Sequence, residues 1–252
     1  MKKPLIVLPF GSLLFFMLFS YGFNRPAGKT FPDNAAKGFA VVELFTSEGC
    51  SSCPPAEEAV AALAKEYPSN VFVLCLHVDY WDNLGWKDAF SSADYTRRQQ
   101  QYAAIFNINS IYTPQAIVNG RIEFTGSDKK KLYATVQDAL AKNINSTIEI
   151  SANASGQKEI TVSYKADVNK GSMLQLAIVQ PAASSAVQRG ENKGRLLHHI
   201  NVVRSLKTVN GGKGVVHIAL PEGLVAKDCR VIAFIQSRAD LRIIGAAECA
   251  IQ

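Results

Sequence analysis

The chain has 252 residues, of which 48% are hydrophobic, and its formal net charge is +6. This length is enough to bury a substantial core in one large domain or two modest ones. The basic residues are scattered apart from the run Lys129-Lys130-Lys131, and they form no basic patch interleaved with aromatic residues. The composition therefore argues against a nucleic acid as a partner.

Residues 1–22 have the pattern of a signal peptide. A positive start at Lys2-Lys3 is followed by an almost unbroken apolar run and by small residues at Ser20-Tyr21-Gly22. The apolar run could also just span a bilayer, so an uncleaved membrane anchor is the alternative. Residues 23–37 are rich in Pro, Gly, Asn and Lys and are predicted to be a linker. We expect an exported protein, periplasmic or secreted, with membrane contact only through an uncleaved N-terminal segment.

Residues 38–143 are predicted to form an α/β domain. An apolar strand, an amphipathic helix and a buried strand come first and make a parallel βαβ unit. A largely helical stretch, a hairpin around Asn119-Gly120 and a last helix follow. The elements are expected at 39–45, 54–67, 71–78, 86–106, 116–118, 121–124 and 129–142.

Beyond residue 146 the pattern changes to short alternating strands. This pattern predicts an all-β, sandwich-like domain over residues 146–252. A long inserted segment, 180–210, is expected to interrupt it. The strands are expected at 147–152, 159–166, 173–179, 214–219, 230–236 and 242–248.

The motif Cys50-Ser51-Ser52-Cys53 lies between the first strand and the first helix. Backbone N–H groups and the helix dipole favour a thiolate at such a position. Cys50 is predicted to be the exposed nucleophile and Cys53 the resolving thiol, with a Cys50–Cys53 disulfide in the oxidised form.

Acidic residues near the motif oppose a thiolate, so we expect a mild lowering of the pKa of Cys50 and a reducing to middling potential. These residues are Glu48, Glu57 and Glu58. Two other interpretations of the motif remain open, a structural disulfide and half of a zinc site, although the chain offers no second ligand pair with suitable spacing.

The other three cysteines are interpreted from their surroundings. Cys75 lies inside an apolar run and is predicted to be a buried, inert thiol. Cys229 and Cys249 flank the predicted terminal hairpin. If Gln236 faces Arg242 across that hairpin, the two cysteines are cross-strand neighbours, and a Cys229–Cys249 disulfide is expected.

The order of elements around the dithiol resembles the thioredoxin fold over roughly residues 38–143. This resemblance implies a cis peptide bond at Thr113-Pro114, opposite the dithiol, where the backbone of Pro114 would meet an extended substrate. Longer strings resemble a secreted thioredoxin-like family catalogued as domain of unknown function 1223, and they cover most of the chain after the signal. The strings are Glu43-Leu-Phe-Thr-Ser-Glu-Gly-Cys-Ser-Ser-Cys-Pro-Pro-Ala, His77-Val-Asp-Tyr-Trp-Asp, Tyr112-Thr-Pro-Gln, Gly190-Glu-Asn-Lys-Gly-Arg and His199-Ile-Asn-Val-Val-Arg.

Further side chains are candidates for the cleft beside the dithiol. The carboxyl ends of parallel strands share one sheet edge, so His77, Tyr80 and Trp81 are expected to line the substrate site with Thr113. The alternative is a packed turn in which the tryptophans belong to the core. Glu43 is one residue out of step with the buried acid of thioredoxins, which would place it on the opposite face of its strand. The alternative for Glu43 is a charge at a strand edge or in a salt bridge.

The inserted segment carries two adjacent histidines, His198 and His199. Adjacent side chains point to different sides of most backbones, so a metal ion shared by these two is not expected. The segment either folds over the dithiol, which would bring Arg195 or Arg204 near the thiolate, or forms a solvated loop.

Three functions are compatible with these patterns. The first is an exported thiol–disulfide oxidoreductase that needs no cofactor and no metal and acts on protein or small-molecule disulfides. The second is a non-catalytic binding module with a static Cys50–Cys53 disulfide. The third is a metal-handling protein that uses both thiols with His77. Fold alone does not decide among them, and the sequence does not identify a substrate.

Overall fold

The computed structural model describes residues 38–143, 146–221 and 223–252, which belong to one compact unit. The predicted signal peptide, 1–22, and linker, 23–37, lie outside the described residues. No helix in the described part of the chain is both long enough and apolar enough to cross a membrane.

The first half of the described chain follows the predicted order of elements. Helix α1 starts with two prolines, which suit the first turn of a helix, and buries Ala56, Val60 and Leu63 on one face. Helix α2 starts later than predicted, because the Ser92 side chain accepts a hydrogen bond from the Asp94 backbone and caps the helix there. The elements are β1 (Ala40–Thr46), α1 (Pro54–Glu66), β2 (Val71–His77), α2 (Ala93–Phe106), β3 (Gln115–Val118), β4 (Ile122–Thr125) and α3 (Lys129–Leu140).

The second half is almost entirely β structure. The described chain also contains two short 3-10 turns, Asp82–Leu84 in the first half and Ala226–Asp228 in the second. The strands are β5 (Ile148–Ala154), β6 (Glu159–Ala166), β7 (Ser172–Ala186), β8 (Leu196–Val209), β9 (Lys213–Ala219), β10 (Arg230–Ser237) and β11 (Ile243–Ala250).

A large mixed sheet of eight strands runs through both halves, in the order β11-β10-β7-β8-β2-β1-β3-β4. Strands β1 and β2 are parallel, as predicted, and β2 is also parallel to β8 through the pair Cys75–Val202. Strands β5, β6 and β9 form a second, antiparallel sheet. The fold is therefore mostly β, with few helices.

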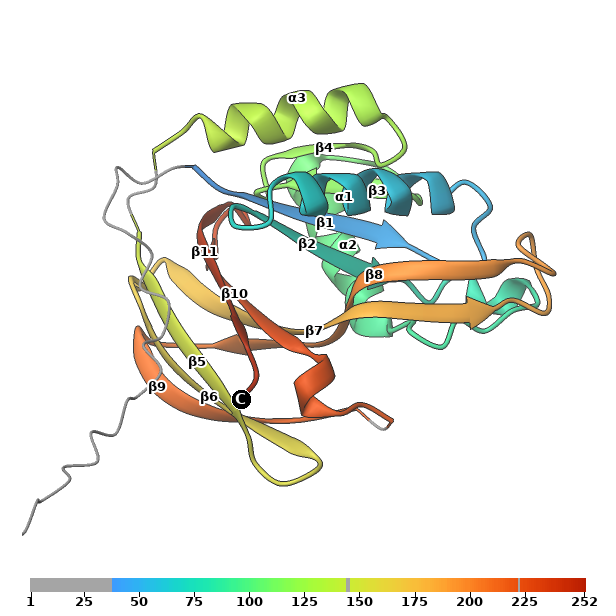
Figure 1. The fold of residues 1–252 in the computed structure, drawn as a ribbon. Coiled ribbons are helices and arrows are strands. Elements are labelled where there is room, and N and C mark those ends of the chain that lie inside the picture. The colour runs from blue at the N-terminus through green and yellow to red at the C-terminus, as the bar shows by residue number, and fades with distance from the viewer. Residues whose placement is uncertain (1–37, 144–145, 222) are drawn as a thin grey trace, which may run out of the picture. The chain divides into compact units, whose positions relative to one another are not determined.

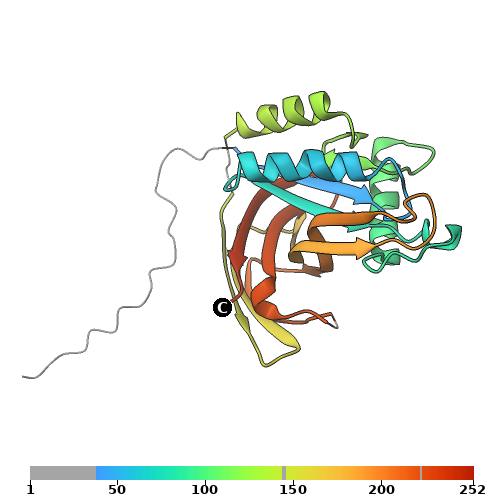
Figure 2. The same ribbon diagram turned by 45° about the vertical axis from the view of Figure 1, so that its right-hand side comes forward.

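Three buried clusters hold these layers together. One lies under α1 and α3, which cover the same face of β1, β2 and β3 (Figures 1 and 2). A second packs Tyr95 and Tyr102 of α2 against the opposite face. A third fills the space between the three-stranded sheet and strands β7 and β10. The dithiol therefore starts a helix that is fixed on a fully buried strand pair.

The predicted inserted segment, 180–210, is a β-hairpin built from the outer parts of β7 and β8. Strand β8 pairs with β2, so strands from both sides of the predicted 143–146 boundary lie in one sheet. Strand β8 was not predicted from the sequence, because the buried face of this strand carries His199 and Asn201 in place of apolar residues. An alternation of apolar and polar residues is the signal by which a half-buried strand is recognised.

The predicted register of the terminal hairpin is wrong. Gln236 faces Ile243 and not Arg242, and a bulge between Ile235 and Gln236 shifts the pairing by one more residue, so Cys249 faces Val231 and not Cys229. The side chains of Cys229 and Cys249 are therefore displaced along the ladder, and both are free thiols. A bulge of this kind adds one residue to one strand and leaves no mark in the hydrophobic pattern.

Candidate functional site

The dithiol lies where β1 leads into α1. The carbonyl of Cys53 accepts the first hydrogen bonds of the helix, from Ala56 at 2.9 Å and Glu57 at 3.1 Å. All five cysteines are free thiols, so the structure holds the dithiol in its reduced form, without the expected Cys50–Cys53 bond. Cys50 is only 1% exposed, whereas the sequence predicted an exposed nucleophile.

The two thiols differ strongly in acidity. The hydrogen bond from the Cys53 thiol lowers the pKa of Cys50 to about 6 against the opposing effect of burial, and the Ser52 and Thr113 side chains lower it further. Burial and the neighbouring Cys50 raise the pKa of Cys53 well above its usual range. At neutral pH Cys50 is therefore a thiolate and Cys53 a thiol, which suits a nucleophile and a resolving group.

Nearby acids oppose the thiolate less than the sequence suggested. Glu58 is exposed on α1, where solvent screens its charge. Glu48 and Glu57 are buried on either side of His199, with O–N distances of 3.4 Å and 2.7 Å. Neither carboxylate contributes to the pKa of Cys50, which falls further than the mild shift expected from sequence because the Cys53, Ser52 and Thr113 side chains stabilise the thiolate.

Three of the predicted substrate-site residues meet at the dithiol. The Thr113–Pro114 peptide bond is cis, as the resemblance implied, and the Thr113 side chain bonds Cys50. The indole N–H of Trp81 donates to Thr113 Oγ1 at 2.8 Å, and the Trp81 side chain packs against Gly49. Burial raises the pKa of Tyr80, whose hydroxyl is buried without a hydrogen-bond partner among the described residues. These contacts fix the wall around Cys50.

The tip of the β7–β8 hairpin covers the loop that carries Cys50. Asn192 is fully buried and donates to the carbonyls of Glu48, at 2.8 Å, and Cys50, at 3.0 Å. Glu191 accepts a bond from the Ser51 backbone at 2.9 Å. Sequence reasoning missed both residues, although they lie in the string quoted at Gly190, because nothing local connects them with residues 48–51. Their contacts explain why Cys50 is covered.

The two arginines of the hairpin have separate places. Arg195 donates to Asn192 Oδ1 at 2.7 Å and so supports the cover from its outer side. Arg204 lies over the ring of Phe90 and donates to Gln180, away from the dithiol. None of the contacts that set the pKa of Cys50 comes from either arginine.

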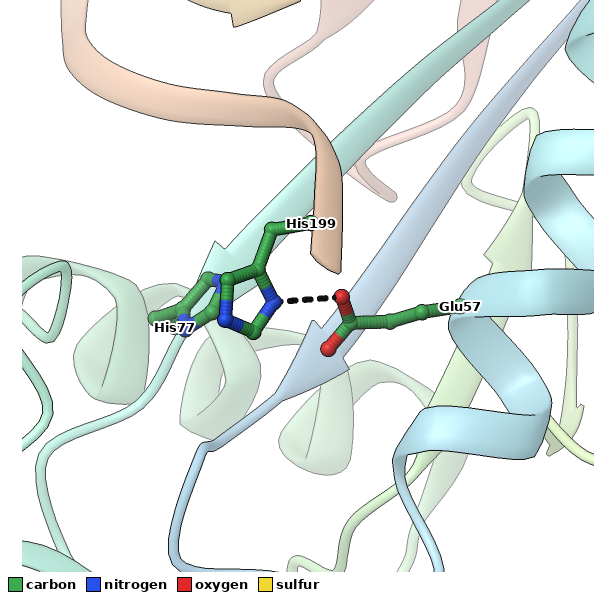
Figure 3. A group of neighbouring side chains, drawn as sticks. All are labelled: Glu57, His77 and His199. Carbon is green, nitrogen blue, oxygen red and sulfur yellow. Dashed lines mark hydrogen bonds and ion pairs between the residues drawn. The ribbon is translucent and has the colours of Figure 1, made fainter. Parts of the chain in front are cut away.

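His77 lies in a buried cluster beneath the dithiol. Its Nδ1 is 2.6 Å from Asp88 Oδ2, and its ring is 4.9 Å from that of His199. Figure 3 shows His199, from β8, between His77 at the end of β2 and Glu57 on α1. The adjacent His198 is exposed, so the two neighbouring histidines do point to opposite sides. The structure thus assigns His77 to this cluster and not to the substrate wall.

A chain of hydrogen bonds connects that cluster to the resolving thiol. The Thr46 side chain acts on the Cys53 thiol, whose pKa it lowers against the larger effect of burial, and it donates to Glu57 Oε1 at 2.7 Å. The other oxygen of Glu57 meets His199. Glu43, by contrast, is on the opposite face of β1, where it forms a buried ion pair with Arg98 and accepts a bond from Tyr102. The acid connected to Cys53 through Thr46 is therefore Glu57.

Comparison with known proteins gives a family and one closely covering structure. The family described as Protein of unknown function (DUF1223) matches residues 41–236, well over half of the chain. The crystal structure of protein AGR_C_4864 from Agrobacterium tumefaciens is 29% identical, covers 86% of this chain and 95% of that one, and has a TM-score of 0.62. A domain of the outer membrane lipoprotein Omp28 from Porphyromonas gingivalis is 16% identical, covers 43% of this chain and 89% of that one, and has a TM-score of only 0.27. None of the curated proteins matches the chain.

Proposed function

We propose that this chain, which belongs to the family described as Protein of unknown function (DUF1223), is an exported thiol–disulfide oxidoreductase with a thioredoxin-like arrangement of β1, α1, β2 and β3. The observation that carries the proposal is the opposite acidity of the two thiols at the start of α1. A static disulfide has no need of a stabilised thiolate, whereas disulfide exchange depends on one.

The reaction starts with the Cys50 thiolate, which attacks one sulfur of a substrate disulfide. A mixed disulfide forms, and the other substrate sulfur leaves as a thiolate. Cys53 then loses its proton and attacks the Cys50 sulfur, which releases the second substrate thiol and leaves a Cys50–Cys53 disulfide. The substrate gains two electrons, and its two sulfurs take up one proton that originates from Cys53 and one from solvent; a thiol reductant must then restore the dithiol.

Proton loss from Cys53 is the difficult step, because burial stabilises its neutral form. The Thr46 hydroxyl, which lies between the Cys53 thiol and Glu57, offers a path for that proton. We assign Glu57 as the acceptor. His199, on the other oxygen of Glu57, holds the carboxylate in place.

The second candidate is the binding module, and the cover over the dithiol favours it. Cys50 is 1% exposed beneath Asn192, so a substrate reaches the sulfur only if the tip of the β7–β8 hairpin moves. A module that binds through its surface and keeps the two thiols as a permanent disulfide would need no such movement.

The pH dependence of Cys50 alkylation tests the proposed thiolate. With iodoacetamide and the reduced full chain, the rate at Cys50 is expected to rise with a midpoint near pH 6, because its pKa is about 6. Cys249 is the internal control, since burial and Glu248 raise its pKa to about 11. Mass spectrometry of the peptides separates the two sites.

Two variants make this test sharper. Asn192→Ala removes the two bonds that Asn192 donates to the carbonyls of Glu48 and Cys50 and is expected to raise the alkylation rate at every pH without moving the midpoint. Thr113→Val removes a hydroxyl that stabilises the thiolate and is expected to move the midpoint upward. A midpoint near the ordinary thiol value of about 8.5, or a Cys50 that stays unreactive in Asn192→Ala, would favour the binding module.

A further inference from the structure

Two buried imidazoles each have one nitrogen in use and one without a partner. Nδ1 of His77 is 2.6 Å from Asp88 Oδ2, and Nδ1 of His199 is 2.7 Å from Glu57 Oε2. The residues are 0% and 2% exposed. The Nε2 atoms of both rings are buried and have no hydrogen-bond partner among the described residues. An unpartnered buried polar atom is costly and calls for a ligand.

Carboxylate oxygens converge on the same place. One ligand atom each from Glu57, His77 and His199 lies within 4.8 Å of the other two. Glu48 Oε1 is also buried without a hydrogen-bond partner, 3.4 Å from His199 Nε2, while its other oxygen accepts a bond from Trp86. The cluster therefore presents imidazole nitrogen and carboxylate oxygen to one small volume.

We propose that His77, His199 and Glu57 bind a divalent transition-metal ion of the zinc type, with Glu48 beside them as a fourth donor. Asp88 on Nδ1 of His77 is the usual arrangement around a metal-binding histidine, because the carboxylate fixes the ring and its tautomer. Two imidazoles and a carboxylate form a donor set that zinc uses widely. An ion on Nε2 of His199 lies on the other side of the ring from Nδ1, so Glu57 exchanges its bond to Nδ1 for the ion and keeps the bond from Thr46 on its other oxygen.

The charges of the cluster favour a cation. Three buried carboxylates, those of Glu48, Glu57 and Asp88, face the two imidazoles. Arg204 is the cation at the edge of this group, above Phe90 and near Asp88. A divalent ion takes the place of the proton on His199, and the three carboxylates are then balanced by the ion and Arg204. Buried carboxylates without compensation are strongly destabilising.

The geometry needs a small adjustment. Zinc bonds of about 2.0–2.2 Å place neighbouring ligands closer together than the 4.8 Å limit found here, so the side chains close in by about 1 Å around the ion. The ring of Phe90 lies 5.3 Å from His77 and 5.4 Å from His199. It also lines a groove of about 310 Å³ with Arg204 and Tyr95. Rotation of Phe90 would therefore give an ion a path to the imidazoles.

This site excludes the thiols, which makes it testable apart from the proposed redox function. The probe is Zn²⁺ alone, added to the full chain carrying Cys50→Ser and Cys53→Ser after treatment with a chelator. We expect about one equivalent of zinc to remain after gel filtration, as measured by elemental analysis. Calorimetry then gives the affinity. Failure of this chain to retain zinc would overturn the proposal and leave the dithiol chemistry untouched.

Substitutions in the same background identify the ligands. His77→Ala and His199→Ala are expected to abolish retention, and Asp88→Asn to weaken binding about 10- to 100-fold, because Asp88 orients a ligand without touching the ion. His198→Ala is the matched control, an exposed histidine next to His199 on β8. If the His77→Ala or His199→Ala chain binds zinc as tightly as the parent chain with only Cys50→Ser and Cys53→Ser, the proposed site is contradicted.

A spectroscopic measurement guards against variants that fail to fold. Co²⁺ replaces zinc in the Cys50→Ser, Cys53→Ser chain, and its visible absorption reports the ligand geometry. We expect the intense bands of four-coordinate cobalt without a thiolate charge-transfer band. The weak bands of a six-coordinate ion, or a thiolate band from another cysteine, would overturn the assignment.

Discussion

A Cys50→Ser variant is expected to lose its disulfide-reducing turnover down to the rate of the uncatalysed reaction. The low pKa of Cys50, about 6, keeps roughly nine tenths of this thiol ionised at pH 7, against about 3% for an ordinary cysteine of pKa about 8.5. Serine has no comparable nucleophile at this pH. The reduction of a small disulfide by the full chain, with excess dithiol as reductant, measures the loss.

The companion variant, Cys53→Ser, is expected to fail at the second step. It should accumulate a mixed disulfide on Cys50, visible by mass, because the resolving thiol is missing. Cys249→Ser, a half-buried thiol away from the dithiol, is the control and should keep full turnover. Turnover that persists in Cys50→Ser would contradict the assignment of the nucleophile.

Replacement of His199 with alanine is expected to reduce the free energy of unfolding by about 3–5 kcal/mol at neutral pH, because it leaves Glu48 and Glu57 buried without their partner. Burial alone would lower the pKa of His199, but the bond to Glu57 and the nearby charge of Glu48 raise it to about 10. The imidazolium holds the hairpin strand β8 against α1. Denaturant unfolding of the chelator-treated protein measures the effect.

The interaction of His199 with Glu48 and Glu57 also predicts that the free energy of unfolding depends on pH. The folded-state pKa of about 10 lies above the unfolded value of about 6.5, so the stabilisation is complete below about pH 6.5 and is lost as the pH rises toward 10. The gap between wild type and His199→Ala should therefore shrink over that range. His198→Ala, on the exposed side of β8, should stay within about 0.5 kcal/mol of wild type. If the His199→Ala variant is as stable as wild type at pH 6, the interaction of His199 with Glu48 and Glu57 contributes nothing to stability.

Local patterns explain why so much of residues 38–143 could be predicted. The apolar face of α1, the continuous apolar run of β2 and the Asn119-Gly120 turn are each encoded within a few residues. The motif at Cys50 is equally local, and its position at a helix start follows from Pro54. Such features depend little on the rest of the chain.

Long-range contacts account for what the sequence did not reveal. Strand β8 finds its partner β2 more than 120 positions away, and its buried face is polar because it supplies His199 to the cluster under the dithiol. Asn192 contacts the Cys50 loop through an equally long-range arrangement, because it lies at the tip of the β7–β8 hairpin. The acids near the motif looked like unopposed charges until His199 was placed between them.

The reduction potential of the Cys50–Cys53 pair tests the proposed function most directly. The purified full chain is equilibrated in a graded series of dithiol buffers, and the free thiols are then alkylated and counted by mass. We expect a reversible potential between about −120 and −270 mV, the range of working redox proteins. A potential below about −300 mV would mark the disulfide as structural and contradict the oxidoreductase in favour of the binding module.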